Sequence, residues 1–256
     1  MSRQTVVLLG ASNVTFGWRH LISALRIGLS APLDIFAAGG LGRSYLGPSR
    51  FAHRSLPGIL DSQIWNALKA NSETQTRPVA LVTDLGNDLV YGCSSDDVVQ
   101  AANQSIERLR EFRADIDIVL TRPPRESVDS LSPRRFRFFA SVLFPFRRME
   151  LPDIQNATAE LDDRVVELAR RLNVAVVKPE LDWYGLDPIH IRRACRVEAF
   201  CRMAEQWDAW NASQSEQRRV AASVALPIPH QRTAFGRSIT TPQPSRQYRN
   251  ADIHAY

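Results

Sequence analysis

Short apolar runs alternate with longer amphipathic segments over most of this chain. Five of the runs are rich in branched or aromatic residues, are bounded by glycine, proline or charge, and are short enough for strands. They are Thr5 to Leu9, Leu33 to Ala37, Val79 to Thr83, Ile116 to Thr121 and Val174 to Val177. Because each run is apolar at successive positions, we expect parallel strands buried on both faces.

The amphipathic segments carry apolar residues at three- and four-residue steps, which is the spacing of one helical face. They are Trp18 to Ile27, Leu60 to Ala70, Val98 to Phe112, Ile154 to Leu172 and, closing the domain, about Ile189 to Trp210. Strands that alternate with helices pair in parallel through right-handed crossovers. The pattern therefore predicts an α/β protein, a three-layer α/β/α sandwich with a five-stranded parallel sheet.

This pattern fails after Asn211, where serine, glutamine, arginine and four prolines occupy the chain without a sustained period. Such a composition is typical of segments that do not bury a core. We therefore expect one domain over residues 1–210 and a largely disordered tail over 211–256.

Composition fits one large domain, since 44% of the 256 residues are hydrophobic. The net charge of +5 is concentrated in the tail, where six arginines stand against Glu216 and Asp252. Since the rest of the chain is nearly neutral, no nucleic-acid partner is expected. Nothing in the sequence defines the oligomeric state.

Three cysteines, Cys93, Cys195 and Cys201, lack the spacing of a zinc site or a disulfide framework and fit a reducing compartment. The apolar run Val6 to Leu9 is too short for the core of a secretory signal or for a membrane span. These features predict a cytoplasmic location.

Residues 132–148 form an unusual segment in which five phenylalanines interleave with five arginines. One interpretation is a lid or a surface-binding element, including contact with a membrane surface. The interpretation favoured by the sequence is an amphipathic helix that packs on the sheet.

Candidate chemistry lies in the loops that follow predicted strands, because ligands of parallel α/β sheets bind beyond the carboxyl ends of the strands. Each loop alone also has a common structural interpretation, such as a helix cap for a serine or a turn for an asparagine. Four loops qualify: Gly10 to Asn13, Ala38 to Ser44, Leu85 to Asp88 and Trp183 to His190.

Together these loops supply a hydroxyl, glycine N–H groups, a side-chain amide, and a histidine three residues after an aspartate. A carboxylate can hold one nitrogen of an imidazole while the other nitrogen faces a nucleophile. The set therefore predicts nucleophilic catalysis by Ser12 with His190 and Asp187.

The same four blocks resemble the signature blocks of the SGNH (GDSL-like) hydrolase superfamily, in chain order, over residues 5–200 approximately. The resemblance implies a flavodoxin-like sheet, no cofactor and no metal, and hydrolysis of small-molecule, glycan or lipid esters. It makes Ser12, Asp187 and His190 the catalytic triad and assigns the oxyanion hole to the N–H groups of Ser12 and Gly42 and the side chain of Asn87.

The chain departs from the common pattern in two places. The first block reads Gly-Ala-Ser-Asn rather than Gly-Asp-Ser, and an asparagine often found before the second-block glycine is absent. Gly39 or Gly40 therefore stays open as the donor in place of Gly42. The sequence also leaves open the acyl chain length, the leaving group, and whether the chain is a hydrolase or an acyltransferase.

Other classes fit the sequence less well. The glycine cluster follows the second strand and lacks the third glycine of a dinucleotide fingerprint, and no Gly-Lys-Ser/Thr of a P-loop occurs. The five histidines lack ligand spacing for a metal. The alternative from another class is a catalytically silent binding or scaffold module with this fold.

Overall fold

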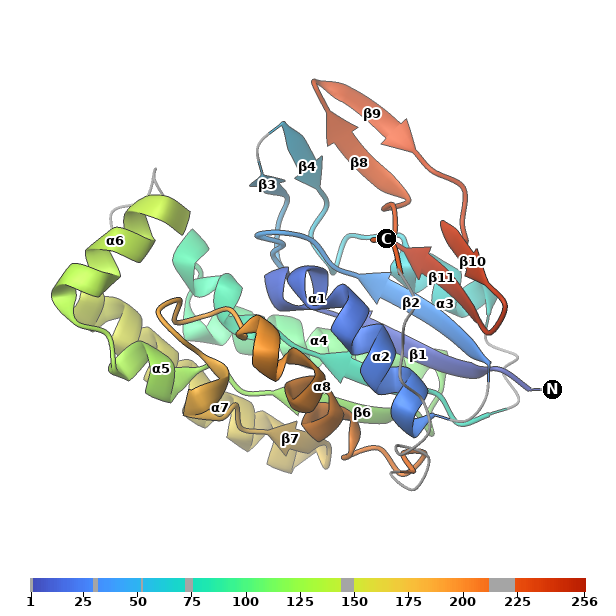
Figure 1. Cartoon of the computed structure of the whole chain (residues 1–256), viewed down its shortest axis with the longest axis horizontal. Coiled ribbons are helices and arrows are strands. Elements are labelled where there is room, and N and C mark those ends of the chain that lie inside the picture. Colours follow the sequence, from blue (N-terminus) through green and yellow to red (C-terminus); the bar gives the residue numbers. More distant parts are fainter. Residues whose placement is uncertain (1, 30–31, 52, 72–75, 144–149, 212–223) are drawn as a thin grey trace.

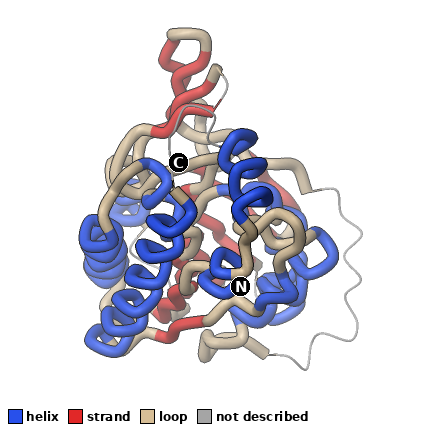
Figure 2. Tube along the Cα trace, turned by 90° about the vertical axis from the view of Figure 1, so that its left-hand side faces the viewer, coloured by secondary structure: helices blue, strands red, loops and turns tan. Residues whose placement is uncertain are grey.

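A computed structural model describes residues 2–29, 32–51, 53–71, 76–143, 150–211 and 224–256 of the chain. It is a mixed α/β structure in which helices cover both faces of a central sheet (Figures 1 and 2). The strands of the central sheet are β1 (Gln4–Leu9), β2 (Leu33–Ala38), β5 (Val79–Val82), β6 (Asp117–Thr121), β7 (Ala175–Val177), β10 (Arg246–Tyr248) and β11 (Ala251–Ala255).

The helices lie in two layers and at the carboxyl edge of the sheet. They are α1 (Ser12–Phe16), α2 (Trp18–Gly28), α3 (Ile64–Ala70), α4 (Ser95–Phe112), α5 (Arg125–Asp129), α6 (Pro133–Leu143), α7 (Leu151–Leu172) and α8 (Arg196–Ala204). Four single turns of 3-10 helix accompany them: η1 (Leu85–Asn87), η2 (Leu89–Tyr91), η3 (Leu181–Trp183) and η4 (Arg193–Cys195). Helices α2 and α8 cover one face, and α3, α4 and α7 cover the other (Figure 1).

The five predicted strands all form, with ends shifted by a few residues at most, and their sheet order is β2-β1-β5-β6-β7. Every residue of β1 is buried. Val7 and Leu9 join the core beneath α3, α4 and α7, whereas Val6 and Leu8 join the core beneath α2 and α8. Because successive side chains of a strand point to opposite faces, a strand between two helical layers must be apolar throughout.

The predicted disordered tail is wrong for residues 224–256. Strand β11 pairs in parallel with β2, and β10 pairs antiparallel with β11, so the sheet has seven strands rather than five. Ile253 of β11 is fully buried opposite Ile35 of β2. The domain therefore extends beyond residue 210, while the part of the tail at 212–223 lies outside the described residues.

A second, four-stranded sheet stands above the carboxyl ends of β2 and β11 (Figure 1). It consists of β3 (Ser49–Phe51), β4 (Arg54–Leu56), β8 (Gln231–Ala234) and β9 (Arg237–Thr240), all antiparallel. Its β8–β9 hairpin projects from the body of the molecule (Figure 2). This sheet joins the loop after β2 to the C-terminal segment.

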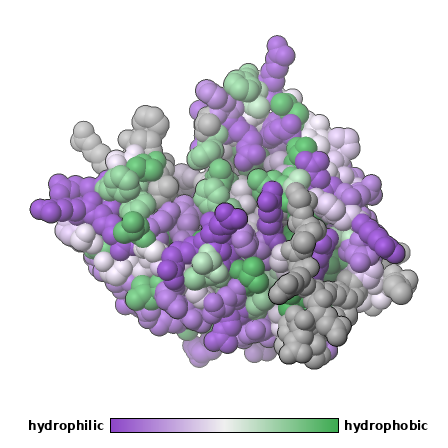
Figure 3. Space-filling model, viewed as in Figure 1, coloured by the Kyte–Doolittle hydropathy of each residue, from purple (hydrophilic) through white to green (hydrophobic). Residues whose placement is uncertain are grey.

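The Arg/Phe segment is helical over α6, but it does not pack on the central sheet as expected. Phe136 packs with Val128 and Leu131 in a small separate cluster at the end of the molecule. Phe138 and Val142 are exposed, and Figure 3 shows hydrophobic surface over this helix. Residues 144–149 of the segment lie outside the described residues. Within the described ranges, no helix combines the length and apolar character needed to cross a membrane.

Candidate active site

The order in which strands are added to the sheet reverses at β1. Strand β2 lies on one side of β1, and β5, β6 and β7 follow on the other side. Such a switch point opens a crevice beyond the carboxyl ends of the two central strands. Gly10 ends β1 there, and a Cβ added to it would lie 2.6 Å from Val14 Cγ2 and 2.7 Å from Thr83 Cγ2. Only glycine lets the turn into α1 come this close to β5.

Ser12, His190 and Asp187 lie in one hydrogen-bonded row at this crevice. His190 Nε2 is 2.9 Å from Ser12 Oγ, and His190 Nδ1 is 2.6 Å from Asp187 Oδ2. Since the carboxylate can only accept, Nδ1 carries the proton and Nε2 is free to accept from the hydroxyl. Phe16 of α1 packs against the imidazole at 5.1 Å, with the two rings at 81°. The row therefore joins residues that are 178 positions apart in the sequence.

Asp187 holds the histidine loop as well as the histidine ring. Its Oδ1 accepts the backbone N–H groups of Ile189 at 3.0 Å and His190 at 3.1 Å. Burial acts to raise the pKa of Asp187, but the hydrogen bond and charge of His190 outweigh burial, so the pKa lies below its ordinary value. The carboxyl group is therefore ionised at neutral pH.

The helix expected from about Ile189 begins later. Helix α8 runs from Arg196 to Ala204, shorter than the predicted span from Ile189 to Trp210. Residues 186–190 instead form bends, and the backbone N–H of Arg192 bonds to the carbonyl of Trp183. Asp187 thus closes a turn with the hydrogen bonds of a cap, but without a helix behind it.

Asn13 and Asp84 complete the site, although no sequence pattern indicated a role for either residue. Asp84 Oδ2 accepts the backbone N–H groups of Ala11 at 2.7 Å and Asn13 at 3.1 Å. The Asn13 side chain donates to Asp84 Oδ1 at 2.8 Å and to the Ile189 carbonyl at 2.9 Å, and it accepts from the Ile191 N–H at 2.8 Å. These bonds, which we call the Asn13–Asp84 clamp, tie the serine turn to the histidine loop. Asp84 has a left-handed backbone with a φ of 61°, and the sequence does not reveal this feature.

Hydrogen bonds join the loops that carry two candidate oxyanion donors, Asn87 and Gly42. Asn87 Nδ2 donates to the Arg43 carbonyl at 2.8 Å, which uses one of its two hydrogens. Gly42 has a φ of 63°, a conformation that favours glycine, and its carbonyl accepts from the Tyr91 hydroxyl at 2.6 Å. The Asn87 amide is therefore held at the Arg43–Ser44 peptide, directly after Gly42, whereas Gly39 and Gly40 line a separate pocket.

Buried polar groups fix the loops that carry these donors. Asp88 is fully buried and accepts from the Ser44 hydroxyl and, at 3.0 Å, from the Tyr45 N–H. Burial raises the pKa of Asp88, although these hydrogen bonds oppose the shift. The Tyr45 hydroxyl lies 3.0 Å from the Leu9 carbonyl and 2.8 Å from the Thr83 carbonyl, at the ends of β1 and β5. The second and third loops are thus anchored to each other and to the switch point.

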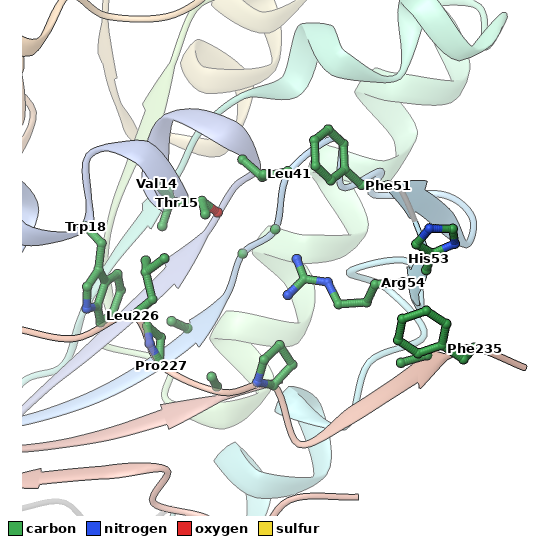
Figure 4. A pocket seen from close by; sticks show the side chains of 16 residues that line it. Val14, Thr15, Trp18, Leu41, Phe51, His53, Arg54, Leu226, Pro227 and Phe235 are labelled. Atoms are coloured by element: carbon green, nitrogen blue, oxygen red, sulfur yellow. The ribbon is translucent and has the colours of Figure 1, made fainter. Parts of the chain in front are cut away.

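Two pockets lie at this end of the molecule. The small pocket, about 80 Å³, has Ser12 and Asn87 in its wall, together with apolar residues that include Pro123, Val128 and Ile154. The large pocket, about 440 Å³, lies beyond β2 and β11 under the four-stranded sheet, as Figure 4 shows. In the described part of the chain, no three His, Cys, Asp or Glu side chains are grouped as metal ligands.

Solved esterases share this fold. The structure is similar to Est24, a carbohydrate acetylesterase from Sinorhizobium meliloti, with a TM-score of 0.56 and 14% identity over 80% of this chain and 98% of that one. It is also similar to an aryl esterase of M. smegmatis, with a TM-score of 0.54 and 14% identity over 79% and 97% of the two chains. No protein-family model and no curated protein matches the sequence. The expected SGNH-type fold is therefore confirmed by structure, while identities this low define the fold alone.

Proposed function

We propose that this chain is a serine hydrolase that acts on carboxylic esters, with Ser12 as nucleophile, His190 as general base and Asp187 as the residue that orients it. The observation that carries the proposal is the row of hydrogen bonds, 2.9 Å from Ser12 Oγ to His190 Nε2 and 2.6 Å from His190 Nδ1 to Asp187. A serine hydroxyl is a weak nucleophile until a neighbouring base takes its proton.

In this mechanism His190 Nε2 takes the proton of Ser12 while Oγ attacks the ester carbonyl carbon. The imidazolium that forms is stabilised by ionised Asp187. The oxyanion of the tetrahedral intermediate is stabilised by the second hydrogen of Asn87 Nδ2 and by the N–H groups of Ser12 and Gly42. His190 then gives its proton to the leaving alcohol. In the second half of the reaction His190 takes a proton from water, which attacks the acyl carbon, and returns that proton to Ser12 Oγ as the acid leaves.

The esterase neighbours support an ester substrate, and the apolar small pocket beside Ser12 supports an uncharged acyl group. An acyltransferase would use the same serine and differ only in the acceptor. Added glycerol separates the two, because a transferase makes the glyceryl ester in preference to the free acid.

The test compares the wild-type chain with Ser12→Ala in hydrolysis of phenyl acetate and in labelling by a fluorophosphonate probe. The wild type should hydrolyse the ester and be labelled once, at Ser12, and the variant should do neither while keeping its melting temperature. A wild-type chain that is neither active nor labelled would identify a silent binding module instead.

A further inference from the structure

The large pocket has the size of a ligand site, since small-molecule pockets span about 300–1,000 Å³ and this one measures about 440 Å³. Its walls are largely apolar, with Phe51 and Leu226 on opposite sides of the space (Figure 4). Helix α1 contributes Val14 and Thr15, which follow Ser12 within one helical turn. The large pocket therefore borders the helix that begins at Ser12, whereas Ser12 itself lines the small pocket.

One charged side chain extends into this apolar space. Arg54 reaches from β4 toward Thr15 and away from Phe235, as Figure 4 shows. Among the described residues, no carboxylate forms an ion pair with Arg54, and no acceptor forms a hydrogen bond with it. Burial lowers the pKa of Arg54, and the charge of Arg232 lowers it further.

The surroundings of Arg54 are positive rather than negative. Arg43 is fully buried, and its pKa falls to about 9 through burial first and the charge of Arg54 second. Its Nη2 has no hydrogen-bond acceptor in the described part of the chain. Arg232 bonds to Thr241 Oγ1 and the Pro229 carbonyl, neither of which carries a negative charge. Arg43 Nη1 donates to an oxygen of Tyr256, so Arg54, which has no such partner among the described residues and lines the pocket, is the cation that favours an anionic ligand.

We propose that the large pocket binds the alcohol half of the ester substrate, and that this half is an apolar chain or ring that ends in a carboxylate paired with Arg54. The proposal rests on the proposed function, because it assigns the two halves of an ester to two pockets. The acyl carbon is bonded to Ser12 in the intermediate, so the acyl group belongs in the small pocket that Ser12 lines.

The position of His190 supports this assignment. His190 must protonate the leaving alcohol, and it packs against Phe16 of α1, the helix that also supplies a wall of the large pocket. The small pocket measures about 80 Å³ and the large pocket about 440 Å³, so the small pocket suits a short acyl group. The substrate class is therefore a short-chain ester of an apolar hydroxy acid.

Binding is tested first without turnover. Calorimetry on the Ser12→Ala chain should show octanoate binding about tenfold more tightly than the uncharged octanamide, the range expected for a hydrogen bond to a charged partner. Adding Arg54→Met should remove that difference, whereas Arg50→Met, which removes an exposed arginine of β3, should keep it. Equal binding of octanoate and octanamide, or equal effects of the two arginine variants, would overturn the carboxylate site even if the chain proves to be an active esterase.

Turnover then tests which half of the ester enters the pocket. The carboxylate of 4-acetoxybenzoate should lower KM about tenfold relative to 4-acetoxybenzamide, and Arg54→Met should abolish this difference, whereas Arg50→Met should keep it. A carboxylate on the acyl side, as in phenyl hydrogen succinate compared with phenyl butyrate, should give no advantage that depends on Arg54. If it does, the assignment of the alcohol half is wrong.

Discussion

The parallel strands of the central sheet and the C-terminal strands meet at the same edge of the molecule, but they are built differently. Strands β1 and β5 are buried along their whole length, and the loops that follow them are fixed by hydrogen bonds to Asp84 and Asp88. Strands β8 and β9 are short and partly exposed, and among the described strands β8 pairs on its other side with the short β4. The buried strands therefore position the proposed chemistry, whereas the exposed sheet supplies a wall and the Arg54 charge to the large pocket.

The largest effect is expected at Asp187, in the rigid half of the comparison. Asp187→Asn keeps the capping oxygen but changes the partner of His190 Nδ1, so we expect turnover of phenyl acetate to fall about 10²- to 10⁴-fold with nearly unchanged stability. Asp182→Asn is the matched control, because Asp182 is exposed and uses its backbone carbonyl for its contacts. Equal losses in the two variants would leave Asp187 with a structural role only.

The wild type and Asp187→Asn should also differ in stability at acid pH. The folded chain lowers the pKa of Asp187 below its ordinary 3.8, so the folded state binds this proton less readily than the unfolded state. The ionised group therefore stabilises the fold above pH of about 4, and this contribution is lost as the pH falls through the folded pKa. Melting temperatures between pH 7 and pH 3 should fall more steeply for the wild type than for Asp187→Asn, and parallel curves would contradict the shift.

The next largest effect tests whether the C-terminal segment belongs to the core. Ile253→Ala removes a fully buried side chain from β11, so we expect a loss of about 2–5 kcal/mol in the free energy of unfolding. Ile239→Ala in the exposed sheet should cost less, and neither variant should change phenyl acetate turnover per folded molecule. Urea titration measures both losses, and an Ile253→Ala variant as stable as the wild type would show that β11 does not dock on β2.

The sequence predicted the five central strands because burial on both faces leaves a local signature, an unbroken apolar run such as Val6 to Leu9. It could not predict β11, which reads Ala-Asp-Ile-His-Ala and buries only alternate residues. Its partner β2 lies more than 200 residues away in the sequence. The prolines and arginines around β11 matched the composition of a disordered tail, and composition carries no information about distant pairing.

The same limit applies to the site. Ser12, Asp187, His190 and Asn87 follow strand ends, so their positions could be inferred from the pattern of the sheet. Asp84 also follows β5, yet its role depends on a left-handed backbone and on the turn after β1, two features that no local pattern specifies. The proposed role of Arg54 depends on the pairing of β4 with β8, which brings Arg232 beside it, and the sequence does not specify this pairing.

The Asn13–Asp84 clamp gives the third effect. Asn13→Ala removes the side-chain bonds that join the serine turn to the histidine loop, and a shift of about 1 Å between catalytic groups can cost about 10²-fold in rate, which is about 2.7 kcal/mol. We expect kcat to fall by this factor with KM unchanged, measured on phenyl acetate.

A control separates positioning from stability in this variant. Thr121→Val removes another buried hydrogen bond, between Thr121 and Thr83 at 2.7 Å, without touching the clamp. It should lower the melting temperature but keep kcat. A similar loss of kcat in both variants would mean that Asn13 acts through general stability rather than through the position of His190.

The smallest effect lies at the tip of the exposed sheet. Phe235 and Gly236 connect β8 to β9 with φ angles of 50° and 75°, the left-handed pair that two-residue hairpins require and that Asn-Gly adopts best. A bulky residue in this conformation costs about 1–2 kcal/mol, whereas asparagine tolerates it. Phe235 nevertheless lines the large pocket and stacks on His53 at 5.1 Å, so replacing it also removes a contact.

Two substitutions at this position separate the backbone from the ring. Phe235→Ala loses the stacking and keeps the unfavourable φ, whereas Phe235→Asn loses the stacking and relieves the backbone. We therefore expect the asparagine variant to be more stable than the alanine variant by about 1 kcal/mol, a difference of about 2–4 °C in melting temperature for a chain of this size. Both should bind octanoate more weakly than the wild type, because the ring lines the large pocket. Equal melting temperatures would show that the hairpin relaxes without cost, and unchanged octanoate binding would place the ligand at the α1 end of the pocket, out of reach of Phe235.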